Sequence, residues 1–241
     1  MSSPRWRTVI FDLDGTLVDT IGLIVASYRH AFEAVLDPGT PPVPEERIRA
    51  WIGQPLIRAF REVSTVHADA LNTAYLTWNE ANTGRLIREY AGVRELLTRL
   101  AAAGVRVAVV TSKRRTHAEL ALGLAGLSAL VGALVAMEDT TEHKPRPEPL
   151  LLALDRLGAP AGEAVYVGDA VVDLEAAHTA GIASVGVTWG AGVRADLVGT
   201  APTALADTVA ELTGILMPEP GQPGTPPGQP LKAAGPPGRP T

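Results

Sequence analysis

Short apolar runs alternate with segments of helical spacing along most of the chain. Continuous, β-prone apolar runs predict buried strands at residues 8–11, 105–110, 133–136, 164–167 and 183–187. Between these runs, apolar positions recur at helical spacing in residues 93–103, 115–124, 149–157 and 174–180. Strands that alternate with helices imply right-handed crossovers and a parallel sheet covered on both faces. The pattern therefore predicts an α/β fold with a Rossmann-like core.

A different pattern separates the first predicted strand from the rest. Asp19 and Thr20 can cap a helix with apolar positions through residues 24–35, and residues 37–44, rich in Pro and Gly, predict a loop. Helical spacing then continues to about residue 88 without a convincing strand. We therefore expect a core domain of residues 1–17 and 88–217 with an inserted helical cap domain of residues 18–87.

Residues 218–241 have a third kind of composition. More than half of them are Pro or Gly, without the three-residue glycine period of collagen. Such a segment cannot bury enough apolar surface to offset the entropy lost on ordering. We expect a disordered tail with no catalytic role.

Composition narrows the classes of function and partner. The chain has no cysteine, which excludes disulfides, thiolate metal sites and cysteine nucleophiles. Its net charge of −5 argues against a general nucleic-acid-binding surface. No uninterrupted apolar run is long enough to cross a bilayer. We expect a cytoplasmic protein, a monomer or homodimer, with no nucleic-acid or membrane partner.

Polar side chains follow the carboxyl ends of four predicted strands. Sites in open parallel sheets form outside these ends, so residues far apart in sequence should gather at one edge. The residues are Asp12 and Asp14, Thr111 and Ser112, Lys144, and Asp169 and Asp173.

The first pair allows phosphate chemistry. Asp12 and Asp14 are two residues apart, so both can point to one side of the chain. Two neighbouring carboxylates need a cation, and magnesium suits an all-oxygen site. One carboxylate can attack phosphorus while the other moves a proton. Gly15 permits a tight turn whose amides can face an anion, although Asp-x-Asp-Gly by itself is more often a simple turn.

The other strand ends also allow two interpretations each. Thr111 can bind a phosphate oxygen or be only the polar end of a strand. Lys144 can neutralise a nucleophile and a phosphate, or be a solvated loop lysine. Asp169 can be a metal ligand, and Asp173 can support it or cap the following helix.

Four segments together resemble the motifs of the haloacid dehalogenase-like superfamily, in that family's order. They are residues 11–20, Phe-Asp-Leu-Asp-Gly-Thr-Leu-Val-Asp-Thr; residues 109–112, Val-Val-Thr-Ser; residues 143–145, His-Lys-Pro; and residues 167–173, Val-Gly-Asp-Ala-Val-Val-Asp. The resemblance covers residues 8 to about 216. It implies a core with a helical cap that closes over the site, excludes water and selects the substrate.

The resemblance also implies roles for individual residues. Asp12 would be the nucleophile that forms an aspartyl-phosphate, and Asp14 the general acid and then base. Thr111, with Ser112 beside it, would bind the phosphate, and Lys144 would stabilise the charge.

For the cofactor, the resemblance implies a Mg²⁺ ion bound by Asp12, Asp169 and the backbone carbonyl of Asp14. Asp173, Gly15 and Thr16 would support this site.

Within the superfamily, the chain resembles phosphoglycolate phosphatases and bacterial pyrophosphate phosphatases. The resemblance lies in residues 51–56 and 86–93, although Ala91 stands where Pro is common, and residues 170–172 lack the Ser or Asn often found there. The expected activity is magnesium-dependent hydrolysis of a small phosphorylated metabolite. Candidate residues for substrate selection are Gln54, Arg58, Asn79 and Lys113.

Proteins with the same fold have other activities, which particular residues of this chain favour less than phosphate ester hydrolysis. Asp14 argues against a dehalogenase or phosphonate hydrolase, because ester hydrolysis needs a proton for the leaving oxygen. Thr16 resembles the phosphatases more than the sugar phosphomutases, which often carry Val there. A sugar phosphomutase and a non-catalytic binding or regulatory module are the two alternatives.

Overall fold

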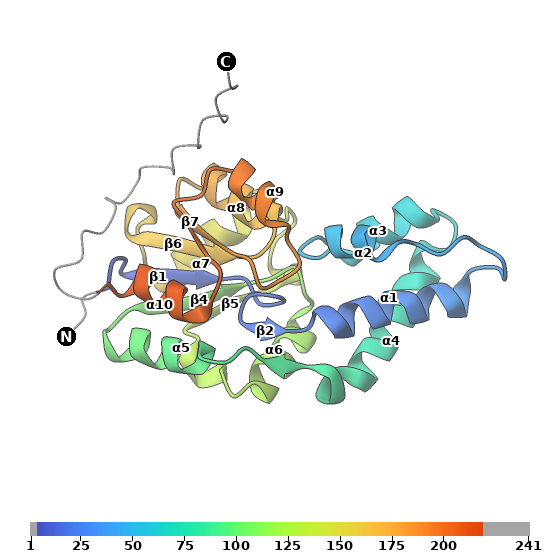
Figure 1. Cartoon of the computed structure of the whole chain (residues 1–241), viewed down its shortest axis with the longest axis horizontal. Helices are drawn as coiled ribbons and strands as arrows, with labels where there is room; N and C mark the ends of the chain where they lie inside the picture. Colours follow the sequence, from blue (N-terminus) through green and yellow to red (C-terminus); the bar gives the residue numbers. More distant parts are fainter. Residues whose placement is uncertain (1–3, 219–241) are drawn as a thin grey trace, which may run out of the picture.

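The computed structural model describes residues 4–218, and its core is a parallel sheet of six strands (Figure 1). The strand order is β5-β4-β1-β6-β7-β8, and every pairing is parallel. The strands are β1 (Thr8–Phe11), β4 (Arg106–Val110), β5 (Ala133–Val135), β6 (Ala164–Gly168), β7 (Ala183–Val187) and β8 (Ala204–Ala206). The predicted α/β fold with a Rossmann-like sheet is confirmed.

Helices cover both faces of this sheet because its strands are apolar on both sides. In β1, Val9 and Phe11 face one apolar core and Ile10 faces the other. The first core includes side chains of α5 (Val93–Ala102), α6 (Arg115–Leu124) and α10 (Val209–Leu216). The second includes side chains of α7 (Glu148–Leu157) and α8 (Val171–Thr179). The central strands are thus rigidly held, which fixes the positions of the residues that follow them.

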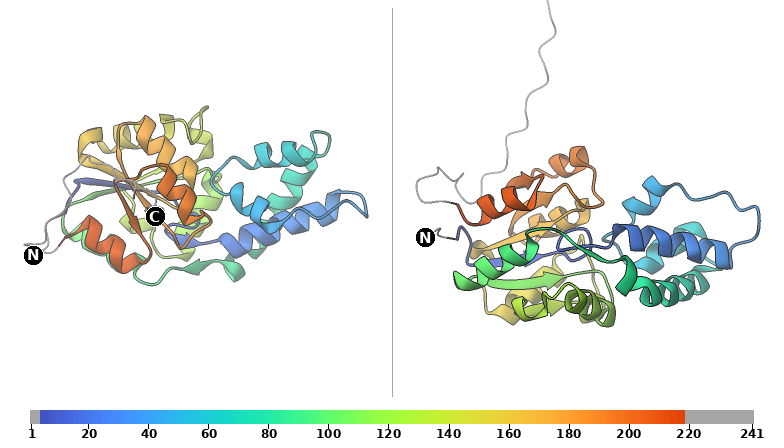
Figure 2. Two further views of the ribbon diagram at one scale, coloured as in Figure 1. Left: turned by 45° about the horizontal axis from the view of Figure 1, so that its top comes forward. Right: turned by 60° about the horizontal axis from the view of Figure 1, so that its bottom comes forward.

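Four helices between β1 and β4 form a separate cluster beside the sheet, in blue to teal in both views of Figure 2. They are α1 (Ile21–Val35), α2 (Glu45–Ala50), α3 (Leu56–Val63) and α4 (Ala68–Leu86). Their own apolar core centres on Tyr28, whose ring lies 4.9 Å from Tyr75 and 5.2 Å from Phe60 between centroids. We call these helices and their loops the cap. The exact domain boundaries at 17/18 and 87/88 stay a prediction.

A short antiparallel pair joins the cap to the core. It consists of β2 (Val18–Asp19) and β3 (Arg88–Glu89), with Val18 opposite Glu89. Residues that leave and re-enter the core therefore lie side by side, although no strand was predicted here. The two-residue length of each strand gives no alternation that a sequence pattern could reveal.

The start of α1 differs from the sequence prediction. Asp19 accepts a hydrogen bond from the backbone N–H of Ile21 at 3.3 Å, but the Thr20 side chain does not cap the helix. The Thr20 hydroxyl instead donates to Asp14 at 2.6 Å. Thr20 thus occupies the position before α1 that was predicted for a cap residue, but its side chain is directed to Asp14 and makes no capping bond.

The last elements were also not predicted from the sequence. After β7 the chain forms α9 (Arg194–Gly199), then β8 and α10. Short 3-10 turns occur at Ser128–Leu130, Met137–Asp139 and Ala161–Glu163. Among residues 4–218, no helix has the length and apolarity needed to cross a membrane. The prediction of a disordered tail over residues 218–241 lies, apart from Pro218, outside the described residues.

Candidate active site

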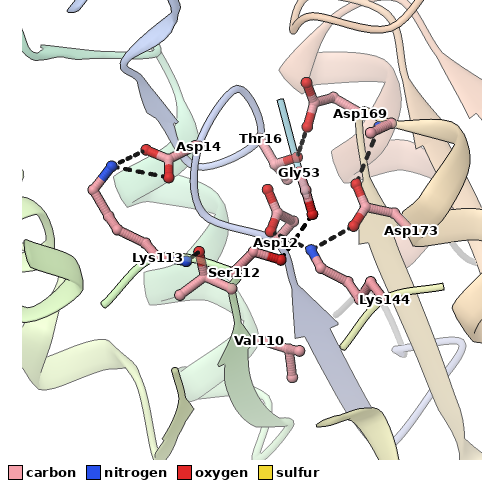
Figure 3. Close-up of polar contacts among 12 residues, drawn as sticks. Asp12, Asp14, Thr16, Gly53, Val110, Ser112, Lys113, Lys144, Asp169 and Asp173 are labelled. Carbon is pink, nitrogen blue, oxygen red and sulfur yellow. Dashed lines mark hydrogen bonds and ion pairs between the residues drawn. The ribbon is translucent and has the colours of Figure 1, made fainter. Parts of the chain in front are cut away.

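Lys144 lies buried between two carboxylates at the carboxyl edge of the sheet (Figure 3). Its ammonium nitrogen is 2.7 Å from Asp12 Oδ1 and 2.6 Å from Asp173 Oδ1, and it also contacts the Tyr166 hydroxyl at 3.1 Å. Asp12 directly follows β1, whereas Asp173 lies in the first turn of α8. The Asp173 Oδ2 atom also accepts from the backbone N–H of Ala170 at 3.0 Å. Asp173 therefore both anchors Lys144 and caps α8.

Asp169, which directly follows β6, is the third carboxylate of the acidic cluster with Asp12 and Asp173. Its Oδ1 accepts from the Thr16 hydroxyl at 3.1 Å, and its Oδ2 accepts from the backbone N–H of Ala191 at 2.7 Å. Gly15 has φ of 83°, and a Cβ there or at Gly190 would overlap the Asp169 carboxylate. The two glycines allow the backbone to approach Asp169 closely, which gives the predicted turn residue Gly15 a second purpose.

The site holds more negative than positive charge. Oxygens of Asp12, Asp169 and Asp173 lie within 4.8 Å of one another, and one ammonium, that of Lys144, contacts this group. Burial raises the pKa of Asp12 well above its usual range, against the attraction of Lys144 and with added repulsion from Asp173. Burial, then Asp173, raises the pKa of Asp169 to about 7. Burial lowers the pKa of Lys144, but Asp12 and Asp173 outweigh it and raise this pKa overall.

This surplus of charge fits a divalent cation. With all three carboxylates ionised, the cluster and the Lys144 ammonium would carry a net charge of −2. A divalent cation would balance this charge, and oxygen donors are the ligands that Mg²⁺ prefers. Asp12 and Asp169 fit as ligands. Asp173 fits less well, because its two oxygens already serve Lys144 and the start of α8. The acidic cluster can therefore hold a metal. The expected ligand set of Asp12, Asp169 and the Asp14 carbonyl, which the family resemblance implies, stays a prediction.

The Asp14 carboxylate forms an ion pair with Lys113 and does not contact Lys144 or Asp169 in this structure. The Lys113 ammonium lies 2.8 Å and 3.0 Å from the two Asp14 oxygens (Figure 3), and the Thr20 hydroxyl donates to the first of them. The Asp14 side chain is therefore not part of the metal cluster. Lys113 was predicted as a substrate contact, and the structure shows that its charge is paired with Asp14.

Thr111 and Ser112 follow β4 at the same edge. Thr111 is buried, and its Oγ1 accepts from the backbone N–H of Lys113 at 3.1 Å. The Ser112 hydroxyl donates to the carbonyl of Gly53, in the cap, at 2.7 Å. A Cβ on Gly53 would lie 3.2 Å from Val172 and 3.3 Å from Ala170, so the cap loop also packs against the last motif. The Ser112 hydroxyl thus makes a contact between cap and core in this structure, and phosphate binding by Ser112 stays a prediction.

A cavity of about 310 Å³ separates the cap from these strand ends. On the core side its lining includes Asp12, Asp14, Thr111, Ser112 and Lys113. Of the residues predicted to select the substrate, Gln54 and Asn79 also line it. Asn79 is buried and donates to Ser27 at 3.0 Å.

Arg58 is not among the residues that line this cavity, and its role in substrate selection stays a prediction. Arg58 is exposed on α3, because the buried positions Ala59 and Phe60 turn the opposite side of that helix toward the cap core. His117 lines the cavity and was missed. His117 lies in the first turn of α6, five residues after Ser112 at the end of the preceding strand, and that position was the only sequence signal that could have indicated it.

Comparisons with known proteins agree with this arrangement. Residues 9–187 match the family described as haloacid dehalogenase-like hydrolase. The chain is 37% identical over 189 residues to pyrophosphatase PpaX of Bacillus velezensis, covering 78% of this chain and 86% of that protein. It is 38% identical over 181 residues to the putative pyrophosphatase PpaX of Caldanaerobacter subterraneus, covering 75% and 81% respectively.

Solved structures give the same result. A putative haloacid dehalogenase-like hydrolase from Bacteroides fragilis superposes with a TM-score of 0.79 at 26% identity, covering 86% of this chain and 99% of that one. A predicted phosphoglycolate phosphatase from Haemophilus somnus superposes with a TM-score of 0.77 at 26% identity, covering 88% and 98%. Fold, arrangement of motifs and sequence similarity all agree, and the chain belongs to the haloacid dehalogenase-like hydrolases.

Proposed function

We propose that this hydrolase is a phosphatase that cleaves a small phosphorylated compound through a phosphoryl group carried on Asp12. The observation that supports it is the buried contact of Asp12 with Lys144, beside Asp169 and at the base of the cavity between cap and core. A carboxylate, a fixed ammonium and an acidic cluster that fits a divalent cation are the components of phosphoryl transfer to a carboxylate.

Magnesium is proposed as the cofactor, held by Asp12, Asp169 and the backbone carbonyl of Asp14. When bound, it supplies positive charge to the oxygens of the transferred phosphoryl group. Lys144 supplies a second positive charge through its contact with Asp12 and fixes the position of that carboxylate. Thr111, buried at the end of β4, would contact a phosphoryl oxygen.

In the first step, an Asp12 oxygen attacks phosphorus and the bond from phosphorus to the leaving oxygen breaks. Asp14 gives its proton to that oxygen, so the leaving group departs neutral at this atom. In the second step, Asp14 takes a proton from a water molecule that attacks phosphorus, which releases phosphate and restores the Asp12 carboxylate. Because Asp14 is paired with Lys113 in this structure, it must exchange that partner for the leaving oxygen during the reaction.

Similar proteins named pyrophosphatase and predicted phosphoglycolate phosphatase make pyrophosphate and phosphoglycolate the first compounds to test. A sugar phosphomutase would use the same nucleophile but return the phosphoryl group to the sugar, so it would release an isomer and no phosphate. A non-catalytic binding module would have no need for a paired Asp12 and Lys144 under a cavity.

The test is phosphate release from an aryl phosphate with and without Mg²⁺, in the wild type and in Asp12→Asn. We expect Asp12→Asn to lower kcat by about three orders of magnitude or more. The matched control is Asp155→Asn, which makes the same change at an exposed position of α7 and should leave kcat unchanged. If the wild type and Asp12→Asn release phosphate equally slowly, the proposal is wrong.

A further inference from the structure

The cap side of the cavity carries no cationic side chain. Within residues 4–218, the cap residues that line it include no Lys, Arg or His. Most of them are apolar or aromatic: Ile24, Tyr28, Trp51, Ile52, Leu56, Ile57, Tyr75 and Leu76. The remaining side chains are amides, from Gln54, Asn72 and Asn79, and one carboxylate, from Asp69. The cap therefore offers nothing that would attract a second anionic group.

The basic residues on the core side of the cavity are either paired with a carboxylate or neutral. Lys113 is largely buried and holds both oxygens of Asp14. Arg114 is exposed, and its side chain lies 3.8 Å from Glu138. His117 is buried, and burial, followed by repulsion from Lys113, lowers the pKa of its imidazole, which leaves the ring neutral at pH 7. In this structure, the cationic side chains of Lys113 and Arg114 that line the cavity thus each face a carboxylate.

These surroundings favour one kind of leaving group. An anion placed against the cap would lose its hydration without gaining a counter-charge, and it would face the carboxylates of Asp14 and Asp69. An uncharged organic group would instead bury apolar surface against the aromatic and aliphatic wall. The amides can bind one or two polar atoms and so fix its orientation.

We propose that the substrate is a phosphate monoester whose leaving alcohol is uncharged and largely apolar, in place of a second phosphoryl group or a carboxylate. The proposal rests on the phosphatase function proposed above and specifies its substrate class. The names of similar proteins indicate pyrophosphate and phosphoglycolate as substrates. The cap residues that line this cavity supply no positive charge to bind the second anionic group of either compound.

The test compares three substrates with the full chain and Mg²⁺: benzyl phosphate, phosphoglycolate and pyrophosphate. Benzyl phosphate and phosphoglycolate are both esters of primary alcohols, so they differ mainly in the charge and polarity of the leaving group. We expect kcat/KM for benzyl phosphate to exceed that for each of the other two by about tenfold or more.

A charge placed in the wall should shift this preference. Leu76 lines the cavity from α4 and is partly exposed, so Leu76→Lys can be accommodated there. We expect it to raise the ratio of kcat/KM for pyrophosphate over benzyl phosphate by about tenfold. Val66→Lys adds the same charge to the cap at a position that is 86% exposed and outside the cavity lining, and it should leave this ratio unchanged.

The outcomes separate this inference from the proposed function. If the wild type hydrolyses pyrophosphate or phosphoglycolate with a kcat/KM above that for benzyl phosphate, the inference is wrong and the phosphatase function stands. An equal shift in Leu76→Lys and Val66→Lys would also overturn it, because charge at the wall would then have no special effect. If folded wild-type protein hydrolyses neither an aryl phosphate nor any of the three test compounds, both proposals fail.

Discussion

Replacing Lys144 with methionine tests whether the buried ammonium is what makes the acidic cluster compatible with folding. Methionine has a similar length and is apolar, so Lys144→Met removes the charge while filling most of the space. In the native protein the ammonium contacts Asp12 at 2.7 Å and Asp173 at 2.6 Å, and all three side chains are buried.

The expected magnitude follows from these contacts. Removing one partner of a buried ion pair leaves an uncompensated buried charge and costs about 3–5 kcal/mol of unfolding free energy. Here two carboxylates lose the same partner, so Lys144→Met belongs at the upper end of this range. Asp173 also loses its charged partner and keeps only neutral donors, the backbone N–H of Ala170 at 3.0 Å and the Tyr166 hydroxyl at 3.2 Å.

The assay is urea denaturation at neutral pH with a metal chelator, so that a bound cation cannot replace the lost charge. The matched control is Arg146→Met, since Arg146 is 70% exposed and lies 4.0 Å from Glu142. Such a surface pair contributes about 0–1 kcal/mol, so this control should unfold nearly as the wild type does. Adding Asp173→Asn to Lys144→Met should recover part of the loss, with a coupling energy of about 1 kcal/mol or more.

A loss below about 1 kcal/mol in Lys144→Met, no larger than that of Arg146→Met, would refute the reasoning. It would mean that the carboxylates are solvated or neutral in the native protein and need no counter-charge. Equal losses in the single and double variants would show that Lys144 and Asp173 do not act on each other.

Three further changes test other parts of the site. Gly190→Ala places a methyl group against Asp169, and we expect the Mg²⁺ concentration needed for half-maximal activity to rise by about tenfold or more, measured as phosphate release against Mg²⁺; an unchanged value would contradict this. Tyr166→Phe removes a hydroxyl that contacts Lys144 at 3.1 Å and the Val110 carbonyl at 3.2 Å, and it should lower the unfolding free energy by about 1–3 kcal/mol in urea denaturation. His117 has a pKa below its unfolded value of about 6.5, so the unfolded chain takes up this proton first and the contribution of His117 to the unfolding free energy falls as pH drops below about 6.5. Because the raised pKa of Asp169, about 7, acts in the opposite direction, the test is the difference between two proteins in chelator: the wild type should lose stability relative to His117→Asn as pH falls below about 6.5, and a difference that does not change with pH would refute the assignment.

The local chemistry of the site was readable from the sequence. A buried strand that ends in Asp12, a turn at Gly15 and a helix beyond it follow from apolar runs and residue conformational preferences over fewer than about ten positions. Each later strand end was found in the same way, which led to Thr111, Lys144 and Asp169. The parallel sheet followed because strands alternating with helices have few ways to pack.

The partners of these residues depended on the tertiary structure. The sequence allowed Lys144 to be either a solvated loop residue or a charge-stabilising one. Only the folded chain shows that the segment between β5 and α7 brings Lys144 to Asp12, 132 positions away. The pairing of Lys113 with Asp14, the contact of Ser112 with the cap and the exposure of Arg58 were not readable either. Periodicity tells which side of an element is buried, but not which other element covers it.

For substrate selection, the sequence and the tertiary structure also determine different features. The sequence by itself determined that a helical cap follows the first strand and that Asp12 lies beneath it. Which cap side chains enclose the cavity depends on how four helices pack around Tyr28 and on where the Gly53 loop meets the core. The charge of a binding wall is a sum over residues brought together from separate helices, so it exists only in the folded protein.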